Sequence, residues 1–171
     1  DILTYSCRLY NDWIGEFCSA APKRLKGIAM LNVDDVGDGV KELERCAKLG
    51  LVGAMIAVYP LVGRSYDRPE YDPFWAAAQD MEMPIGLHLG TERVPWRLSG
   101  TDEAMRPSSV CNSDHSVRMS LADIIFGGVF ERFPKLKTCV TETGTAFCLP
   151  PFLRLLDHNY HDIQFSHKLG D

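Results

Sequence analysis

The chain alternates between short apolar runs and longer stretches in which apolar residues recur at helical spacing. The short runs have the length of buried strands and cover about residues 25–31, 51–58, 84–90 and 136–142. The helical stretches cover about residues 8–19, 35–49, 72–83, 121–129 and 150–160. Strict alternation of apolar strands with amphipathic helices predicts an α/β fold in which helices cover a parallel sheet.

Local signals support several of these boundaries. The first helix carries four large apolar residues at helical spacing, which predicts a buried face formed by Tyr10, Trp13, Ile14 and Phe17. Gly50 closes the second helix at a C-cap position. The segment 91–116 is polar and contains prolines without a clear period, so we expect a long loop there.

Periodicity alone leaves the architecture open. A doubly wound sheet and a closed (β/α) barrel both give this pattern, and four strands do not close an eight-stranded barrel. In either architecture, ligands bind at the carboxyl ends of the parallel strands. Candidate chemistry is therefore sought where each strand ends.

Two strand ends carry groups suited to metal binding or proton transfer. The third strand ends at His88, between Gly86 and Gly90, and the fourth at Glu142. An imidazole and a carboxylate at one edge of a sheet can bind a divalent metal or share acid–base work. The alternatives are a hydrogen-bonded histidine inside the sheet and a glutamate turned to solvent.

The remaining histidines are weaker candidates. His115 lies in the expected loop, which in a barrel could fold over the mouth and contact substrate, although an ordinary loop before a helix is the simpler interpretation. His158 and His161 are three apart on the last predicted helix and are read as part of a solvated helix end.

The composition indicates which classes of molecule the protein can bind. The 171 residues suit one domain, and a formal charge of −5 gives no basic surface for nucleic acid or anionic membranes. No apolar stretch approaches the length of a membrane span, and no glycine-rich phosphate loop is present in the sequence. We therefore expect a small-molecule substrate.

Six cysteines without a CxxC pair indicate reduced, mostly buried thiols instead of a zinc knot. Cys139, inside the apolar run of the fourth strand, is expected to behave as a small buried hydrophobe. Reduced thiols favour a cytoplasmic protein.

Several segments together resemble the amidohydrolase-related barrels that include aminocarboxymuconate-semialdehyde decarboxylase and related aromatic-acid decarboxylases. The matching segments run through nearly the whole chain in order, and they are Tyr10-Asn11-Asp12-Trp13, Pro22-Lys23-Arg24-Leu25, Glu42-Leu43-Glu44-Arg45, Leu49-Gly50-Leu51-Val52-Gly53, Tyr71-Asp72-Pro73-Phe74-Trp75, Pro84-Ile85-Gly86-Leu87-His88 and Phe130-Glu131-Arg132-Phe133-Pro134-Lys135-Leu136. The resemblance implies a partial TIM-like (β/α)8 barrel of the metal-dependent hydrolase type. Its strands would be similar to the third to sixth of the full barrel.

The resemblance also implies a site. His88 falls on the family's metal-ligand histidine, and the metal would be divalent, with zinc expected and manganese as the alternative. Glu142 stands where many members have a histidine, as in a branch with Glu-x-Gly, and would be a further ligand or a catalytic group. His115 is kept as a second candidate catalytic residue because of its place in the expected loop, and not because of the resemblance. The family's His-x-His pair and its final aspartate are not in this sequence, so 1–171 reads as one domain incomplete at both ends.

The implied reaction is hydrolysis or non-oxidative decarboxylation of a small carboxylated compound. Two other interpretations stay open, a non-catalytic barrel-derived module that binds a ligand or partner, and a metal-free enzyme with Glu142 as base. Since a partial barrel exposes two sheet edges, we also expect a homo-oligomer.

Overall fold

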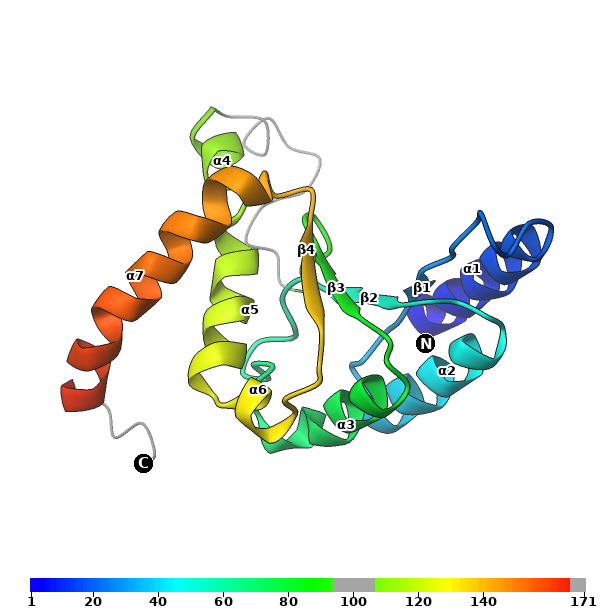
Figure 1. The fold of residues 1–171 in the computed structure, drawn as a ribbon, viewed down its shortest axis with the longest axis horizontal. Helices are drawn as coiled ribbons and strands as arrows, with labels where there is room; N and C mark the ends of the chain where they lie inside the picture. The colour runs from blue at the N-terminus through cyan, green and yellow to red at the C-terminus, as the bar shows by residue number, and fades with distance from the viewer. Residues whose placement is uncertain (94–106, 167–171) are drawn as a thin grey trace.

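Four short parallel strands form one sheet in the computed structural model, which describes residues 1–93 and 107–166 (Figure 1). Their order in the sheet is their order in the chain, β1 (Ala29–Met30), β2 (Ala54–Ala57), β3 (Ile85–His88) and β4 (Thr138–Thr141). Each strand lies within a predicted apolar run. The parallel strands alternating with helices confirm the predicted α/β fold.

Helices connect the strands throughout the described part of the chain. They are α1 (Ile2–Ser19), α2 (Val36–Lys48), η1 (Pro69–Tyr71), α3 (Asp72–Asp80), α4 (Pro107–Cys111), α5 (His115–Phe126), α6 (Val129–Arg132) and α7 (Thr145–Ser166). Among the helices of the described residues, none combines the length and apolarity that a membrane crossing requires.

The expected loop over 91–116 is wrong at its carboxyl end, because α4 lies there and α5 starts at His115. The stripe of α5 begins one turn earlier than the sequence indicates, at buried Val117. Ser120 obscured it, since this polar residue is buried and donates a hydrogen bond to the Val58 carbonyl. Residues 94–106 of the expected loop lie outside the described part. Near the carboxyl end of the chain, helix α7 starts at Thr145, whereas the sequence predicts a helix from about residue 150.

The two faces of the sheet differ in burial. Helices α2, α3 and α5 cover one face, whose buried side chains include Ala54, Ile56, Ile85 and Leu87. Side chains alternate between faces along a strand, so the other face carries Met30, Met55 and His88, which are all partly exposed. In a barrel this open face is the interior, and ligands bind at the end of it where the strands finish.

The cysteines also differ in burial. All six cysteines are free. Cys7, Cys18 and Cys46 are buried as expected, whereas Cys111 is exposed and Cys148 is only partly buried. The expectation for Cys139 is wrong, because this residue is exposed on β4. It lies beside Gly86 on the open face of the sheet.

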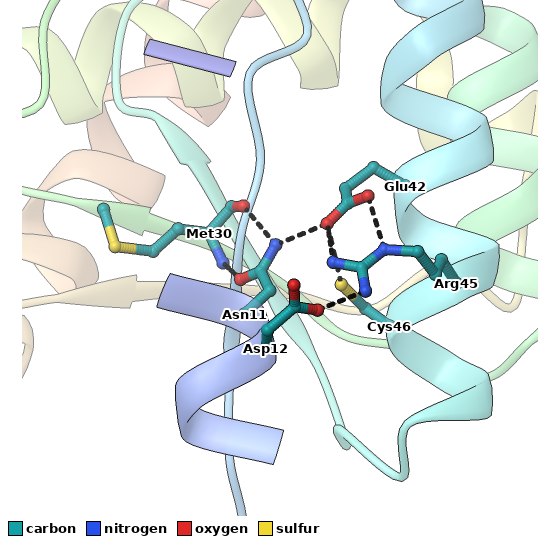
Figure 2. A network of polar contacts seen from close by, with 6 residues as sticks. All are labelled: Asn11, Asp12, Met30, Glu42, Arg45 and Cys46. Atoms are coloured by element: carbon teal, nitrogen blue, oxygen red, sulfur yellow. Dashed lines mark hydrogen bonds and ion pairs between the residues drawn. The ribbon is translucent and has the colours of Figure 1, made fainter. Parts of the chain in front are cut away.

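A polar network closes the free edge of β1 (Figure 2). The Asn11 amide donates to the Met30 carbonyl at 2.9 Å and accepts from the Met30 N–H at 2.8 Å, as a neighbouring strand would. Asn11 also donates to Glu42 at 2.9 Å, and Arg45 joins Glu42 to Asp12. Burial raises the pKa of Glu42, but the hydrogen bonds from Arg45 and Asn11 outweigh it, so the pKa is lowered. The network fixes α1 and α2 to the sheet.

This contact also sets the rotation of α1. Its buried face consists of Cys7, Asn11, Gly15 and Cys18. Trp13 and Phe17, which we expected to be buried, are therefore 56% and 53% exposed. With exposed Ile2, Tyr5 and Leu9 they form an apolar stripe.

The exposed apolar stripe on α1 supports the expected homo-oligomer, which stays a prediction. Light scattering on the purified chain tests it by measuring the mass in solution. A monomer would contradict it.

Two carboxylates meet where the loop before η1 packs against the end of α5. A Cβ at Gly127 would lie 2.1 Å from the Cβ of Asp67, so only glycine permits this approach. Within the described residues, Oδ1 of Asp67 is buried without a hydrogen-bond partner. Burial, together with the charge of Asp67, raises the pKa of Asp123 to about 6.

The Asn11 network predicts a large loss of stability in the Asn11→Leu variant. The substitution leaves the Met30 N–H and carbonyl without a partner and removes one of the hydrogen bonds of Glu42, which keeps Arg45. We therefore expect the free energy of unfolding to fall by about 3 kcal/mol in urea denaturation. Lys41→Met, which removes the exposed ion pair to Asp38, serves as the control and should change stability by less than about 0.5 kcal/mol. Equal effects of the two variants would contradict a structural role for the network.

The raised pKa of Asp123 predicts a pH dependence of stability. Folding raises this pKa above that of an unfolded aspartate, so the ionised form opposes folding at neutral pH. The free energy of unfolding should rise, on the order of 1 kcal/mol after allowance for solvent screening, as the pH falls from about 7.5 to about 5. Asp123→Asn should lose this component in urea titrations, whereas Asp80→Asn, which removes an exposed carboxylate, should keep it. An unchanged profile in Asp123→Asn would refute the assignment.

Candidate functional site

The two strand-end residues singled out in the sequence lie at one edge of the sheet. His88 is the last residue of β3 and pairs in register with Thr141, the last residue of β4. Glu142 follows directly. Its Oε2 lies 3.5 Å from Nε2 of His88, so the structure brings the imidazole and the carboxylate together.

The hydrogen bond of His88 determines which ring nitrogen is available. Nδ1 lies 2.7 Å from the Leu89 carbonyl, which only accepts, so Nδ1 carries the proton in the neutral ring. Nε2 then presents its lone pair toward Glu142. The Thr91 hydroxyl holds the following turn, because it donates to the His88 carbonyl at 2.7 Å and accepts from the Val58 N–H at 2.8 Å.

The backbone at Glu142 is strained. Its φ of 62° is left-handed, a conformation that costs a non-glycine residue on the order of 1 kcal/mol. The side chain is 69% exposed, which agrees with the alternative that it turns to solvent, yet its carboxylate lies beside His88. Strain of this kind is characteristic of functional sites and turns the chain sharply where β4 ends.

The pair fits a metal ion chemically. Two ligand atoms about 2.1 Å from one tetrahedral metal lie roughly 3.4 Å apart, close to the 3.5 Å between Nε2 and Oε2. Neutral imidazole and carboxylate are both ligands for zinc and manganese. Within residues 1–93 and 107–166, no group of three or more histidine, cysteine, aspartate or glutamate side chains is arranged to hold a metal. The described chain therefore contains a candidate pair of ligands and no complete metal shell.

The remaining histidines of the described residues lie on helices α5 and α7. His115 is the exposed first residue of α5, and α5 starts at the end of the sheet where β4 finishes (Figure 1). His158 is exposed on α7, as expected for a solvated helix. The His161 side chain lies outside the described residues, so a contact between these two is not established.

Sequence reasoning missed an ion pair at the same edge. Asp34, shortly after β1, binds the guanidinium of Arg93, which follows β3, through Nε at 3.3 Å and through a second nitrogen. Arg64 donates to the Asp34 carbonyl. The partners are 59 residues apart, so no local pattern shows the contact. Only the topology of the fold could have indicated this contact, because the loops that follow parallel strands gather at one edge of the sheet.

Comparison with known proteins supports the resemblance. The chain is 30% identical over 169 residues to a gamma-resorcylate decarboxylase of Rhodococcus jostii, covering 88% of this chain and 48% of that protein. It is 27% identical over 161 residues to a 2-amino-3-carboxymuconate-6-semialdehyde decarboxylase of Dictyostelium discoideum, covering 88% and 40%. The chain thus spans half or less of the length of these curated relatives.

A solved structure agrees with both the fold and the family. The crystal structure of a dihydroxybenzoic acid decarboxylase from Polaromonas sp. JS666, with bound manganese and the inhibitor 2-nitroresorcinol, superimposes with a TM-score of 0.65 at 27% identity. The match covers 80% of this chain and 43% of that one. The amidohydrolase family model matches residues 1–158. The sheet is therefore part of a TIM-like barrel, and the chain belongs to the amidohydrolase family.

Proposed function

We propose that this chain carries part of the active site of a metal-dependent decarboxylase that acts on a small carboxylated aromatic compound. The observation that supports this most is the His88–Glu142 pair at 3.5 Å on the open face of the sheet. The relatives named as decarboxylases favour carbon dioxide release over hydrolysis. The manganese in the Polaromonas structure favours a divalent metal, with manganese or zinc as the candidates.

Each residue has a proposed part. His88 holds the metal through Nε2, and its Nδ1–H bond to the Leu89 carbonyl keeps the ring in the binding tautomer. Glu142 is the second ligand. When bound, the metal supplies Lewis-acid stabilisation of the negative charge on substrate oxygens.

Decarboxylation also needs a group that donates a proton to the ring carbon. The bond between the ring and the carboxylate breaks, carbon dioxide leaves, and the electron pair stays on the ring carbon, which must then receive a proton. We assign this proton transfer to His115, because its side chain is exposed at the start of α5 and histidine is the commonest general acid in enzymes.

The metal-binding proposal predicts a specific loss of affinity. Isothermal titration of Zn²⁺ or Mn²⁺ should show at least about 10-fold weaker binding to His88→Ala than to the wild type, because a first ligand is lost. Glu142→Gln should weaken binding similarly if this residue is a ligand. His158→Ala, an exposed histidine on α7, is the control and should leave the affinity unchanged. Wild-type affinity in His88→Ala would rule out this site.

The reaction itself is tested with 2,6-dihydroxybenzoate and the protein at the full length of its coding region. We expect release of carbon dioxide and resorcinol that stops when a chelator removes the metal. His115→Asn should lower kcat by about 100-fold while metal binding stays intact. Turnover that survives chelation would contradict a metal-dependent reaction. Ligand binding without turnover would favour the non-catalytic module.

A further inference from the structure

A pocket of about 260 Å³ lies on the open face of the sheet, beside the ends of β1 and β2. Met30 and Met55 line it from the strands, and Thr91 and Arg93 line it from the segment after β3. Ala57, another lining residue, is the register partner of His88. The pocket therefore lies one strand away from His88, and neither His88 nor Glu142 is among its lining residues.

The chemistry of the lining suits an aromatic ring. Met30 and Met55 are half-buried thioethers, which make favourable contacts with aromatic rings and adapt to their shape. The volume is below the usual range for drug-sized ligands and accommodates a single substituted ring. Of the described residues that line the pocket, Arg93 is the only cation and Glu92 the only acidic residue. The Arg93 fork of donors matches a carboxylate, so a carboxylated ligand would place its charge on Arg93 and away from Glu92.

The present partner of Arg93 is exchangeable. Asp34 binds the guanidinium but does not line the pocket, and both side chains keep solvent contact, at 31% exposure for Arg93 and 24% for Asp34. Water reaches both side chains, so a ligand carboxylate can compete with Asp34 for the guanidinium, against the hold of two hydrogen bonds. The Arg93 backbone is held independently, because its N–H donates to the Tyr59 carbonyl at 2.9 Å. The guanidinium can thus change partner while the loop stays in place.

We propose that Arg93 is the specificity-determining residue for the substrate carboxylate, and that it releases Asp34 when it binds that carboxylate. The inference rests on the proposed function for the identity of the substrate. Its central claim concerns binding alone, which is measurable without turnover.

Two probes and three variants test the proposal. The probes are 2,6-dihydroxybenzoate and resorcinol, which share a ring and differ in the carboxylate. By isothermal titration, the wild type should bind the carboxylated probe at least about 10-fold more tightly, and Arg93→Met should abolish that preference. Asp34→Asn should strengthen binding of the carboxylated probe about 3- to 10-fold, since the internal competitor is removed.

The control is Arg64→Met, which removes another contact to Asp34 from a residue that does not line the pocket. It should keep the preference. If Asp34→Asn and Arg93→Met instead weaken both probes equally, the pair merely holds the loops, and the proposal is wrong. It is equally wrong if the wild type shows no preference for the carboxylate.

The outcome is separable from that of the proposed function. A carboxylate preference that depends on Arg93 supports the inference even if His88→Ala leaves metal affinity unchanged. If the Arg93→Met variant still prefers the carboxylated probe and still shows metal-dependent turnover, the inference about Arg93 is wrong. The proposed reaction is then unaffected.

Discussion

The parallel register between β3 and β4 is the constraint on which the candidate site depends. It pairs His88 with Thr141, so that the next residue, Glu142, meets the imidazole. Because side chains alternate along a strand, a slip of one residue would turn His88 toward the helices that cover the other face. The left-handed backbone at Glu142 completes the arrangement by returning its carboxylate toward β3. Chemistry at this edge therefore follows from strand pairing.

The same sheet explains why α1 packs as it does. Asn11 satisfies the outward backbone groups of Met30, and this requirement outweighs the tendency of Trp13 and Phe17 to face a core. A buried carboxamide at a strand edge costs less than two unpaired backbone groups would. The large apolar residues remain on the surface as a consequence.

The sequence predicts the strands and most helices because apolar periodicity reflects burial directly, and it predicts His88 and Glu142 because both end an apolar run. It does not predict the early start of α5, where buried Ser120 interrupts the stripe. It also does not reveal the Asp34–Arg93 pair, since a contact between loops requires the topology and not a local pattern. Exposure of Cys139 was missed for a related reason, because an apolar strand does not show which face is covered.

These features describe one edge of a family barrel, with a candidate metal pair and a nearby pocket that we propose for an aromatic acid. The most direct test is a crystal structure of the chain soaked with manganese, with anomalous scattering measured at the manganese absorption edge. The account predicts a single strong anomalous peak bonded to both Nε2 of His88 and Oε2 of Glu142. A peak bound elsewhere, or none at full manganese saturation, would contradict it.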